Sequence, residues 1–346
     1  MAIDRDLGLV REILEEMLAG ADLGAERSRQ LGDALMEGAL SPSQMGAVLA
    51  LWRAKGETVA ELIGLVGSMM SHCVRVELGR DAVDTCGTGG DRLGTFNIST
   101  AAAMVVAGSG LPVAKHGNRA ASSRCGSADV LEALGVVIDL DPAGVRACVE
   151  KAGMGFMFAP AYHPSMRHVA APRRELGIRT VFNILGPLAN PAGVPYQALG
   201  VSSPALAEQM ANVLAGLGRR RAVVFSGPGG LDELGLDGPS AIWYVASGEV
   251  RADVVNPSEL GLEPAPSSAL LGGGADENAA ALVRVLEGER GPKRDVVLLN
   301  AAAALVAGDR AGSLSEGLAT ARESLDQGHA RRVLERLAAT SREVSS

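Results

Sequence analysis

Three glycines and an aspartate fall close together in the run Cys86-Gly87-Thr88-Gly89-Gly90-Asp91. Glycine lets the backbone approach an anion closely, and the N–H groups of a loop or of a helix start can hold it. Residues 83–85 before the run indicate a short strand, and residues 101–107 after it indicate a helix capped by Ser99 or Thr100. The run therefore predicts an anion site. It is equally typical of a tight turn, because neither the P-loop nor the dinucleotide glycine spacing is present.

A second polar run, Lys115-His116-Gly117-Asn118-Arg119-Ala120-Ala121-Ser122-Ser123, follows a strand expected at residues 112–114. Two cations, an amide and two hydroxyls can all donate hydrogen bonds to phosphate oxygens. The alternative is an ordinary solvated loop after a strand.

The pair Asp232-Glu233 follows a strand expected at residues 222–225. Two carboxylates on such a loop can hold a hard cation such as Mg²⁺, although an acidic pair is usually a surface turn. Two donor-rich loops and one acidic loop together predict a pyrophosphate-bearing substrate with its magnesium. Arg173 lies on an expected helix and could pair with a planar carboxylate, or could simply face water.

Short β-like runs alternate with helical stretches after residue 80, which predicts an α/β fold with a mostly parallel central sheet flanked by helices. Strands are expected near residues 83–85, 112–114, 136–138, 155–158, 196–201 and 222–225, with an edge hairpin over 242–252. Residues 1–75 instead predict a bundle of short helices, with capping boxes at Ser41-Pro42-Ser43-Gln44 and Thr58-Val59-Ala60-Glu61. We therefore expect a small helical domain over 1–78, joined by helices from about 165–190, and an α/β domain over 79–346. Ligands of such sheets bind at the strand ends.

The 346 residues carry a formal net charge of −8, with 47% hydrophobic residues. This composition predicts a globular protein and argues against nucleic-acid binding as its main task. The four cysteines have neither a CxxC nor a zinc spacing, which favours reduced thiols. Met1 to Asp6 lacks an apolar signal core, and no run is long enough to span a membrane. We therefore expect a cytoplasmic protein without a membrane partner.

Several long motifs in one order resemble the anthranilate phosphoribosyltransferase family. They are Gly87 to Asp91 with Thr95 to Thr100, Lys115 to Arg119 with Ser122-Ser123, Arg179 to Leu188, and Gly230 to Glu233. The resemblance runs from Lys55-Gly56-Glu57-Thr58 to Leu298-Leu299-Asn300-Ala301-Ala302, which is nearly the whole chain.

The resemblance implies transfer of the phosphoribosyl group of phosphoribosyl pyrophosphate to the amine of anthranilate, a step of tryptophan biosynthesis. It also implies Mg²⁺, the nucleoside phosphorylase/phosphoribosyltransferase type of fold, and a homodimer joined through the helical domain. The residues implied to contact phosphoribosyl pyrophosphate are Gly87, Gly90, Asp91, Thr95, Asn97, Ile98, Ser99, Thr100, Lys115, His116, Gly117, Asn118, Arg119, Ala120, Ala121, Ser122, Ser123 and Ser127. Those implied to bind anthranilate are Gly87, Asn118 and Arg173, and those implied to bind the metal are Ser99, Asp232 and Glu233. No catalytic residue is assigned; His116 is a candidate anthranilate contact and a candidate base.

Two local departures leave these positions intact. Arg92 stands where the family often has glycine, and the strand before Asp232 ends Phe225-Ser226-Gly227-Pro228, where many members have histidine. The alternatives are a pyrimidine nucleoside phosphorylase of the same fold and a nucleic-acid-binding relative that has lost catalysis. Asn118 and Arg173 argue against the first, and the net charge of −8 with intact motifs argues against the second.

Overall fold

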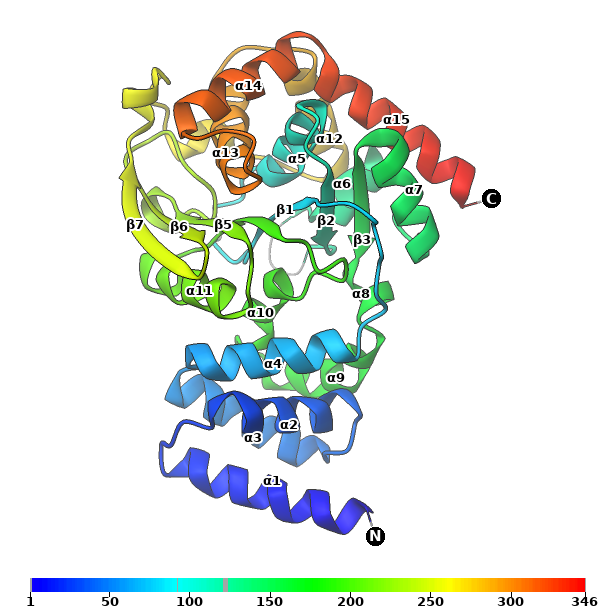
Figure 1. Cartoon of the computed structure of the whole chain (residues 1–346), viewed down its shortest axis with the longest axis vertical. Helices are drawn as coiled ribbons and strands as arrows, with labels where there is room; N and C mark the ends of the chain where they lie inside the picture. Colours follow the sequence, from blue (N-terminus) through cyan, green and yellow to red (C-terminus); the bar gives the residue numbers. More distant parts are fainter. Residues whose placement is uncertain (1, 92, 121–123, 346) are drawn as a thin grey trace. The chain divides into compact units, whose positions relative to one another are not determined.

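The computed structural model describes residues 2–91, 93–120 and 124–345 (Figure 1). The chain forms two compact units, one of Met1–Val74 with Pro160–Pro191 and one of Arg75–Ala159 with Ala192–Ser346. We call them the helical unit and the α/β unit. Within the described residues, no helix is long and apolar enough to cross a membrane.

The helical unit is built from short helices, two of which begin at capping motifs that the sequence predicts. Both predicted capping boxes are confirmed: the Ser41 and Thr58 side chains accept from the backbone N–H of Gln44 and Glu61, whose side chains accept in return. The helices are α1 (Ala2–Leu18), α2 (Gly24–Met36), α3 (Pro42–Lys55), α4 (Val59–Ser71), α8 (Ala159–Tyr162), α9 (Arg167–Leu176) and α10 (Phe182–Leu185), with 3₁₀ turns at Pro164–Met166 and Gly186–Leu188.

The α/β unit is organised on a sheet of seven described strands in the order β3-β2-β1-β4-β5-β6-β7. The first five positions are parallel, and β6 and β7 form the expected antiparallel hairpin at one edge. The strands are β1 (Val83–Gly87), β2 (Val113–Gly117), β3 (Met154–Phe158), β4 (Tyr196–Gly200), β5 (Arg221–Ser226), β6 (Ser240–Ala246) and β7 (Glu249–Val255). The chain runs outward from β1 to β3 on one side, then returns to β4 and β5 on the other.

Helices cover both faces of this sheet, with α11 on the opposite face from α5 and α13 (Figure 1). The helices α5 and α13 are rich in alanine and valine and are buried over most of their length, as expected for helices that are apolar on all sides. The helices are α5 (Ile98–Gly108), α6 (Ser127–Ala133), α7 (Pro142–Ala152), α11 (Pro204–Gly216), α12 (Ala275–Leu286), α13 (Pro292–Ala307), α14 (Leu314–Asp326) and α15 (His329–Val344), with 3₁₀ turns at Pro228–Gly230, Pro257–Leu260 and Ser267–Leu270.

Two local expectations are wrong. Residues 136–138 form no strand: the N–H of Val137 donates to Ser341 Oγ on α15 at 3.0 Å instead of to a strand. Helix α5 begins at Ile98, so Ser99 and Thr100 lie inside its first turn and cap nothing. The N–H of Ser99 is instead taken by Glu233 Oε1 at 3.0 Å. A carboxylate from a loop distant in the sequence thus caps the first turn of α5.

Candidate functional site at the strand ends

Three loops meet at one edge of the sheet because β1, β2 and β5 are parallel and end on the same side. They are the glycine-rich loop (residues 88–97, after β1), the basic loop (residues 118–126, after β2) and the acidic loop (residues 227–239, after β5). The strand order reverses between β1 and β4, where the N–H of Thr88 donates to the carbonyl of Gly200 at 2.9 Å. Such a reversal is where open α/β sheets bind ligands.

The acidic loop closes against the glycine-rich loop through its two carboxylates. The N–H of Gly89 donates to Asp232 Oδ2 at 2.6 Å, while Glu233 holds the first turn of α5. Gly89 and Gly90 both have positive φ, a backbone conformation that glycine adopts readily. The donors expected to hold an external anion therefore hold the chain's own carboxylates here.

Burial disfavours the ionised form of both carboxylates of this acidic pair. Burial and the nearby charge of Asp91 raise the pKa of Asp232 to about 7. Burial and the charge of Asp232 raise the pKa of Glu233 well above its usual range. A divalent cation would relieve both effects, because it stabilises the ionised form of each carboxylate.

Magnesium fits this donor set. The described residues contain no group of three or more His, Cys, Asp or Glu side chains placed to hold a metal. Mg²⁺ is commonly held by one or two carboxylates, with phosphate oxygens and water completing its octahedron. Asp232 and Glu233 can supply the carboxylates, and the hydroxyl of Ser99 lies in the same first turn that Glu233 contacts.

Lys115 and His116 lie inside β2 and are buried, whereas the sequence suggested a loop. Lys115 Nζ donates to the carbonyl of Thr85 and, at 3.3 Å, to Ser99 Oγ. Burial lowers the pKa of Lys115, and the nearby charges of Asp84 and Glu233 oppose that shift. Lys115 therefore joins the middle of β1 to the predicted metal-binding hydroxyl. The backbone N–H of His116 donates to Asp84 Oδ1 at 3.3 Å.

The basic loop is tied to α6, which follows it. Arg119 pairs with Asp129 at 3.1 Å and with Glu132, and its guanidinium lies 5.5 Å from the centre of the Phe158 ring. Asp129 also accepts from the N–H groups of Ala120 and Gly126. A phosphate would therefore have to share Arg119 with two carboxylates.

The remaining predicted residues are distributed as follows. Ser127 begins α6, and its Oγ donates to the carbonyl of Asn118 at 3.4 Å. Asp91 lies in the glycine-rich loop, where its Oδ1 accepts from the N–H of Leu93 at 3.1 Å. Ala121, Ser122 and Ser123 lie outside the described residues, as does Arg92. Their predicted roles stay predictions.

Arg173 belongs to helix α9 of the helical unit. Its guanidinium lies 5.3 Å from the centre of the Phe182 ring, and burial lowers its pKa. Within the described part of the chain, Arg173 makes no ion pair, unlike Arg119. Its charge is therefore not matched by a carboxylate of its own.

Sequence reasoning missed two buried asparagines behind these loops. Asn300 accepts from the N–H of Leu234 at 2.9 Å and donates to the carbonyl of the same residue at 3.0 Å, which fixes the acidic loop on α13. Asn278 bonds to Asn97 of the glycine-rich loop at 2.9 Å. A single amide within the apolar run Val-Val-Leu-Leu-Asn-Ala-Ala was the available signal for Asn300. Asn278 carried no comparable signal.

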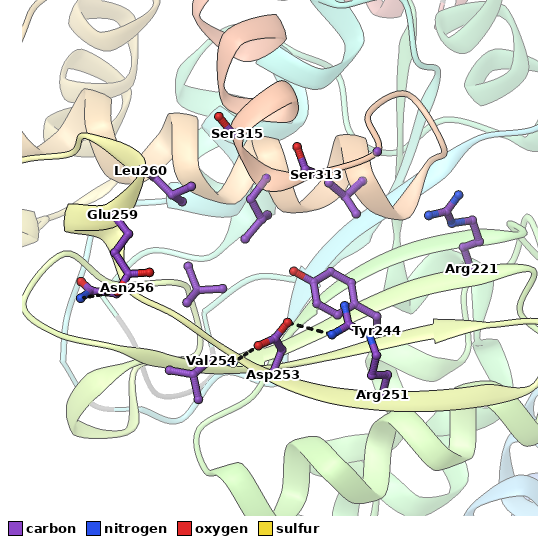
Figure 2. Close-up of a pocket in the computed structure, with 14 residues that line it drawn as sticks. Arg221, Tyr244, Arg251, Asp253, Val254, Asn256, Glu259, Leu260, Ser313 and Ser315 are labelled. Atoms are coloured by element: carbon purple, nitrogen blue, oxygen red, sulfur yellow. Dashed lines mark hydrogen bonds and ion pairs between the residues drawn. The ribbon is translucent and has the colours of Figure 1, made fainter.

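A pocket of about 550 Å³ lies elsewhere in the α/β unit, between the β6–β7 hairpin and the start of α14 (Figure 2). It reaches Arg221, the first residue of β5, and so lies toward the opposite end of that strand from the acidic loop. Its arginines are engaged: Arg251 pairs with Asp253 at 2.9 Å and lies over the Tyr244 ring, and Arg221 pairs with Asp309. The chemistry of the strand-end loops, not cavity size, decides the site.

Comparison with known proteins agrees with this geometry. Residues 79–331 match the α/β domain of a glycosyl transferase family, and residues 11–73 match the helical bundle domain of that family. The anthranilate phosphoribosyltransferase of Pelotomaculum thermopropionicum is 54% identical over 321 residues, which cover 92% of this chain and 93% of that protein. The enzyme of the same name from Thermomicrobium roseum is 53% identical, with 95% and 96% covered.

The chain belongs to the anthranilate phosphoribosyltransferase family. Solved structures of the family agree in fold. The anthranilate phosphoribosyltransferase of Thermus thermophilus superimposes with a TM-score of 0.90 at 45% identity, covering 95% of this chain and 99% of that one. The Saccharomyces cerevisiae family member, solved in complex with PRPP (phosphoribosyl pyrophosphate) and Mg, gives 0.88 at 28% identity, covering 96% and 98%. The expected α/β class with a helical bundle and a mostly parallel sheet is thereby confirmed.

Proposed function

We propose that this chain transfers the phosphoribosyl group of phosphoribosyl pyrophosphate to the amine of anthranilate and releases pyrophosphate. The observation that carries the proposal is the meeting of the glycine-rich and acidic loops through Asp232 and Glu233 at the strand-order reversal. The names of relatives at 47–54% identity favour this activity over a nucleoside phosphorylase or a non-catalytic nucleic-acid-binding relative. Tryptophan biosynthesis is the pathway this activity serves.

In the proposed reaction the bond between ribose C1 and the pyrophosphate oxygen breaks, and a bond forms between C1 and the anthranilate nitrogen. The amine proton leaves to water or to a pyrophosphate oxygen, so no covalent enzyme intermediate is needed. Bound magnesium would neutralise charge on the leaving pyrophosphate. The residues of this chain would hold and orient the substrate and its metal. Asp232, Glu233 and Ser99 would bind the cation, and loop N–H groups would bind phosphate oxygens.

Arg173 and Asn118 are proposed to bind anthranilate. Among the described residues Arg173 has a ring contact but no ion pair, which supports this role, because a guanidinium matches a planar carboxylate bidentately. Asn118 can add an amide donor. We propose His116 only as an anthranilate contact and not as a base, because its side chain is buried in β2.

We further propose Mg²⁺ as the cofactor, a cytoplasmic location and a homodimer joined through the helical unit. The magnesium proposal is supported by the raised pKa values of the acidic pair and by the yeast relative solved with PRPP and Mg.

The test of the activity is direct. The purified chain is mixed with anthranilate, phosphoribosyl pyrophosphate and Mg²⁺, and the loss of anthranilate fluorescence is followed. We expect a loss that depends on all three components and stops when a chelator removes the metal. No loss at high enzyme concentration would refute the proposed function.

Arg173→Ala tests the assignment of the second substrate. It should raise the KM for anthranilate by about 10-fold or more, since a charge-assisted hydrogen bond contributes about 1.5–3 kcal/mol. The KM for phosphoribosyl pyrophosphate should change little. Arg174→Ala, an exposed neighbour on the same helix, is the matched control and should change neither constant. Equal rises in both constants for Arg173→Ala would contradict the assignment.

A further inference from the structure

Asn278 joins three chain segments behind the candidate site. It lies near the start of α12 and is 2% exposed. Its Oδ1 accepts from the N–H of Gly273 at 2.8 Å, and its Nδ2 donates to Asn97 Oδ1 at 2.9 Å. The Nδ2 of Asn97 in turn donates to the carbonyl of Cys125 in the basic loop at 3.2 Å. We call these bonds the amide chain.

The ends of the amide chain fix the direction of every bond in it. A backbone N–H can only donate, so Asn278 must turn its oxygen toward Gly273 and its NH₂ group toward Asn97. The NH₂ group of Asn97 must then face Cys125, whose carbonyl can only accept. A buried polar network with each member paired specifies one arrangement of the segments it joins.

Backbone contacts place the segment before Asn278 directly against the glycine-rich loop. The N–H of Phe96 donates to the carbonyl of Leu270 at 3.0 Å, and the N–H of Gly272 donates to the carbonyl of Gly94 at 2.9 Å. A Cβ on Gly272 would lie only 2.7 Å from Phe96 Cα. Residues 270–273 thus support residues 94–97 from behind, and the amide chain extends this support to the basic loop.

We propose that Asn278 is a positioning residue for phosphoribosyl pyrophosphate. Through Asn97 it sets the spacing between the two donor-rich loops that hold the phosphates of this substrate. Both amide atoms of Asn97 make bonds of this network, so the Asn97 side chain links the two loops. This inference rests on the proposed function, which names the substrate.

Two variants of Asn278 test the proposal. Asn278→Asp keeps the side-chain volume but replaces the donor to Asn97 with an acceptor, and Asn278→Leu removes both polar atoms. We expect each to raise the KM for phosphoribosyl pyrophosphate by about 10-fold, because losing one buried hydrogen bond costs about 1–3 kcal/mol. The KM for anthranilate should change by less than about two-fold, a change worth about 0.4 kcal/mol.

A double-mutant cycle separates positioning from general destabilisation. If Asn278 acts through Asn97, the double variant with Asn278→Leu and Asn97→Ala should have a KM for phosphoribosyl pyrophosphate little higher than that of Asn97→Ala alone. Additive effects of the two changes would overturn the proposal.

Asn300→Leu is the matched control, since Asn300 is also buried and also bonds to a loop of the site. It should raise the magnesium concentration needed for half-maximal rate, because it supports the acidic loop. The Asn278 variants should leave that concentration near the wild-type value. An exposed change, Asn212→Ala on α11, should alter none of these constants.

A measurement without substrates keeps the two proposals distinct. In the substrate-free chain, Asn278→Asp should speed amide hydrogen exchange over residues 94–99 relative to wild type and Asn212→Ala. Unchanged exchange, or equal rises in both KM values, would overturn the role of Asn278. A wild-type chain that is inert with both substrates would instead overturn the proposed function.

Discussion

The last residue of β1, Gly87, shows how a single position constrains the site. A Cβ on Gly87 would lie 2.5 Å from Asp232 Oδ2, too close for the carboxylate to keep its place. The φ of Gly87 is not in the left-handed region, so the need for glycine here comes from space alone. The sequence placed Gly87 at a binding loop, but it could not reveal that the neighbour is Asp232, 145 positions away in the chain.

Gly87→Ala should therefore weaken both metal use and stability. We expect the free energy of unfolding to fall by about 1–3 kcal/mol through overpacking. The magnesium concentration for half-maximal rate should rise, because Asp232 is displaced from Gly89. Denaturant unfolding and a magnesium titration of the rate measure the two effects.

Gly46→Ala is the matched control for this change, because a Cβ there meets nothing within 4 Å. On helix α3, alanine should stabilise the chain by about 0.5–1 kcal/mol relative to glycine. A Gly87→Ala variant that behaves like Gly46→Ala would show that Asp232 can move aside without cost.

At the scale of elements, one carboxylate joins three helix ends in the helical unit. Glu61 is fully buried and accepts from the N–H of Leu23 at the start of α2 and of Thr58 at the start of α4. Lys55, the last residue of α3, donates to Glu61 at 2.9 Å and to Asp22 at 2.6 Å. The capping box predicted the contact with Thr58, whereas the other contacts depend on how the helices pack.

Lys55→Met should destabilise the helical unit strongly, because it leaves Glu61 buried without its cation. Removing one partner of a buried pair costs about 3–5 kcal/mol. Hydrogen exchange over α2 and α4 should rise, while Arg53→Met, an exposed change on the same helix, should leave it unaltered. Equal exchange in the two variants would show that the hydrogen bonds of Glu61 suffice without the lysine.

Local signals fixed most elements but not their tertiary partners. Capping boxes and the alternation of strand and helix patterns predicted the bundle, the five parallel strands and the edge hairpin. The strand prediction for residues 136–138 was wrong because an apolar run does not reveal whether a neighbouring strand is available to pair with it. Three strand-end loops were predicted from the alternation. Asn278 was not, because its role arises from contacts 181 positions apart in the chain.

At the scale of the whole molecule, the proposed homodimer can be tested by measuring the molecular mass in solution. Sedimentation equilibrium should give about twice the 35.4 kDa of one chain. Helical-unit variants that lower this mass without changing the fold of the α/β unit would locate the interface. A mass of one chain at micromolar concentration would contradict the dimer.

The strand order carries a further consequence for how the molecule behaves in a crowded solution. Strand β7 ends the sheet, and its exposed residues include Glu249, Arg251 and Asp253, spaced two apart on one face. An open strand edge is a template for pairing with another chain, and charged side chains discourage that pairing because they would lose water on stacking. The charged residues of the edge hairpin therefore also oppose edge-to-edge aggregation of the sheet. Neutralising these three residues would remove that protection while leaving the distant strand-end loops intact.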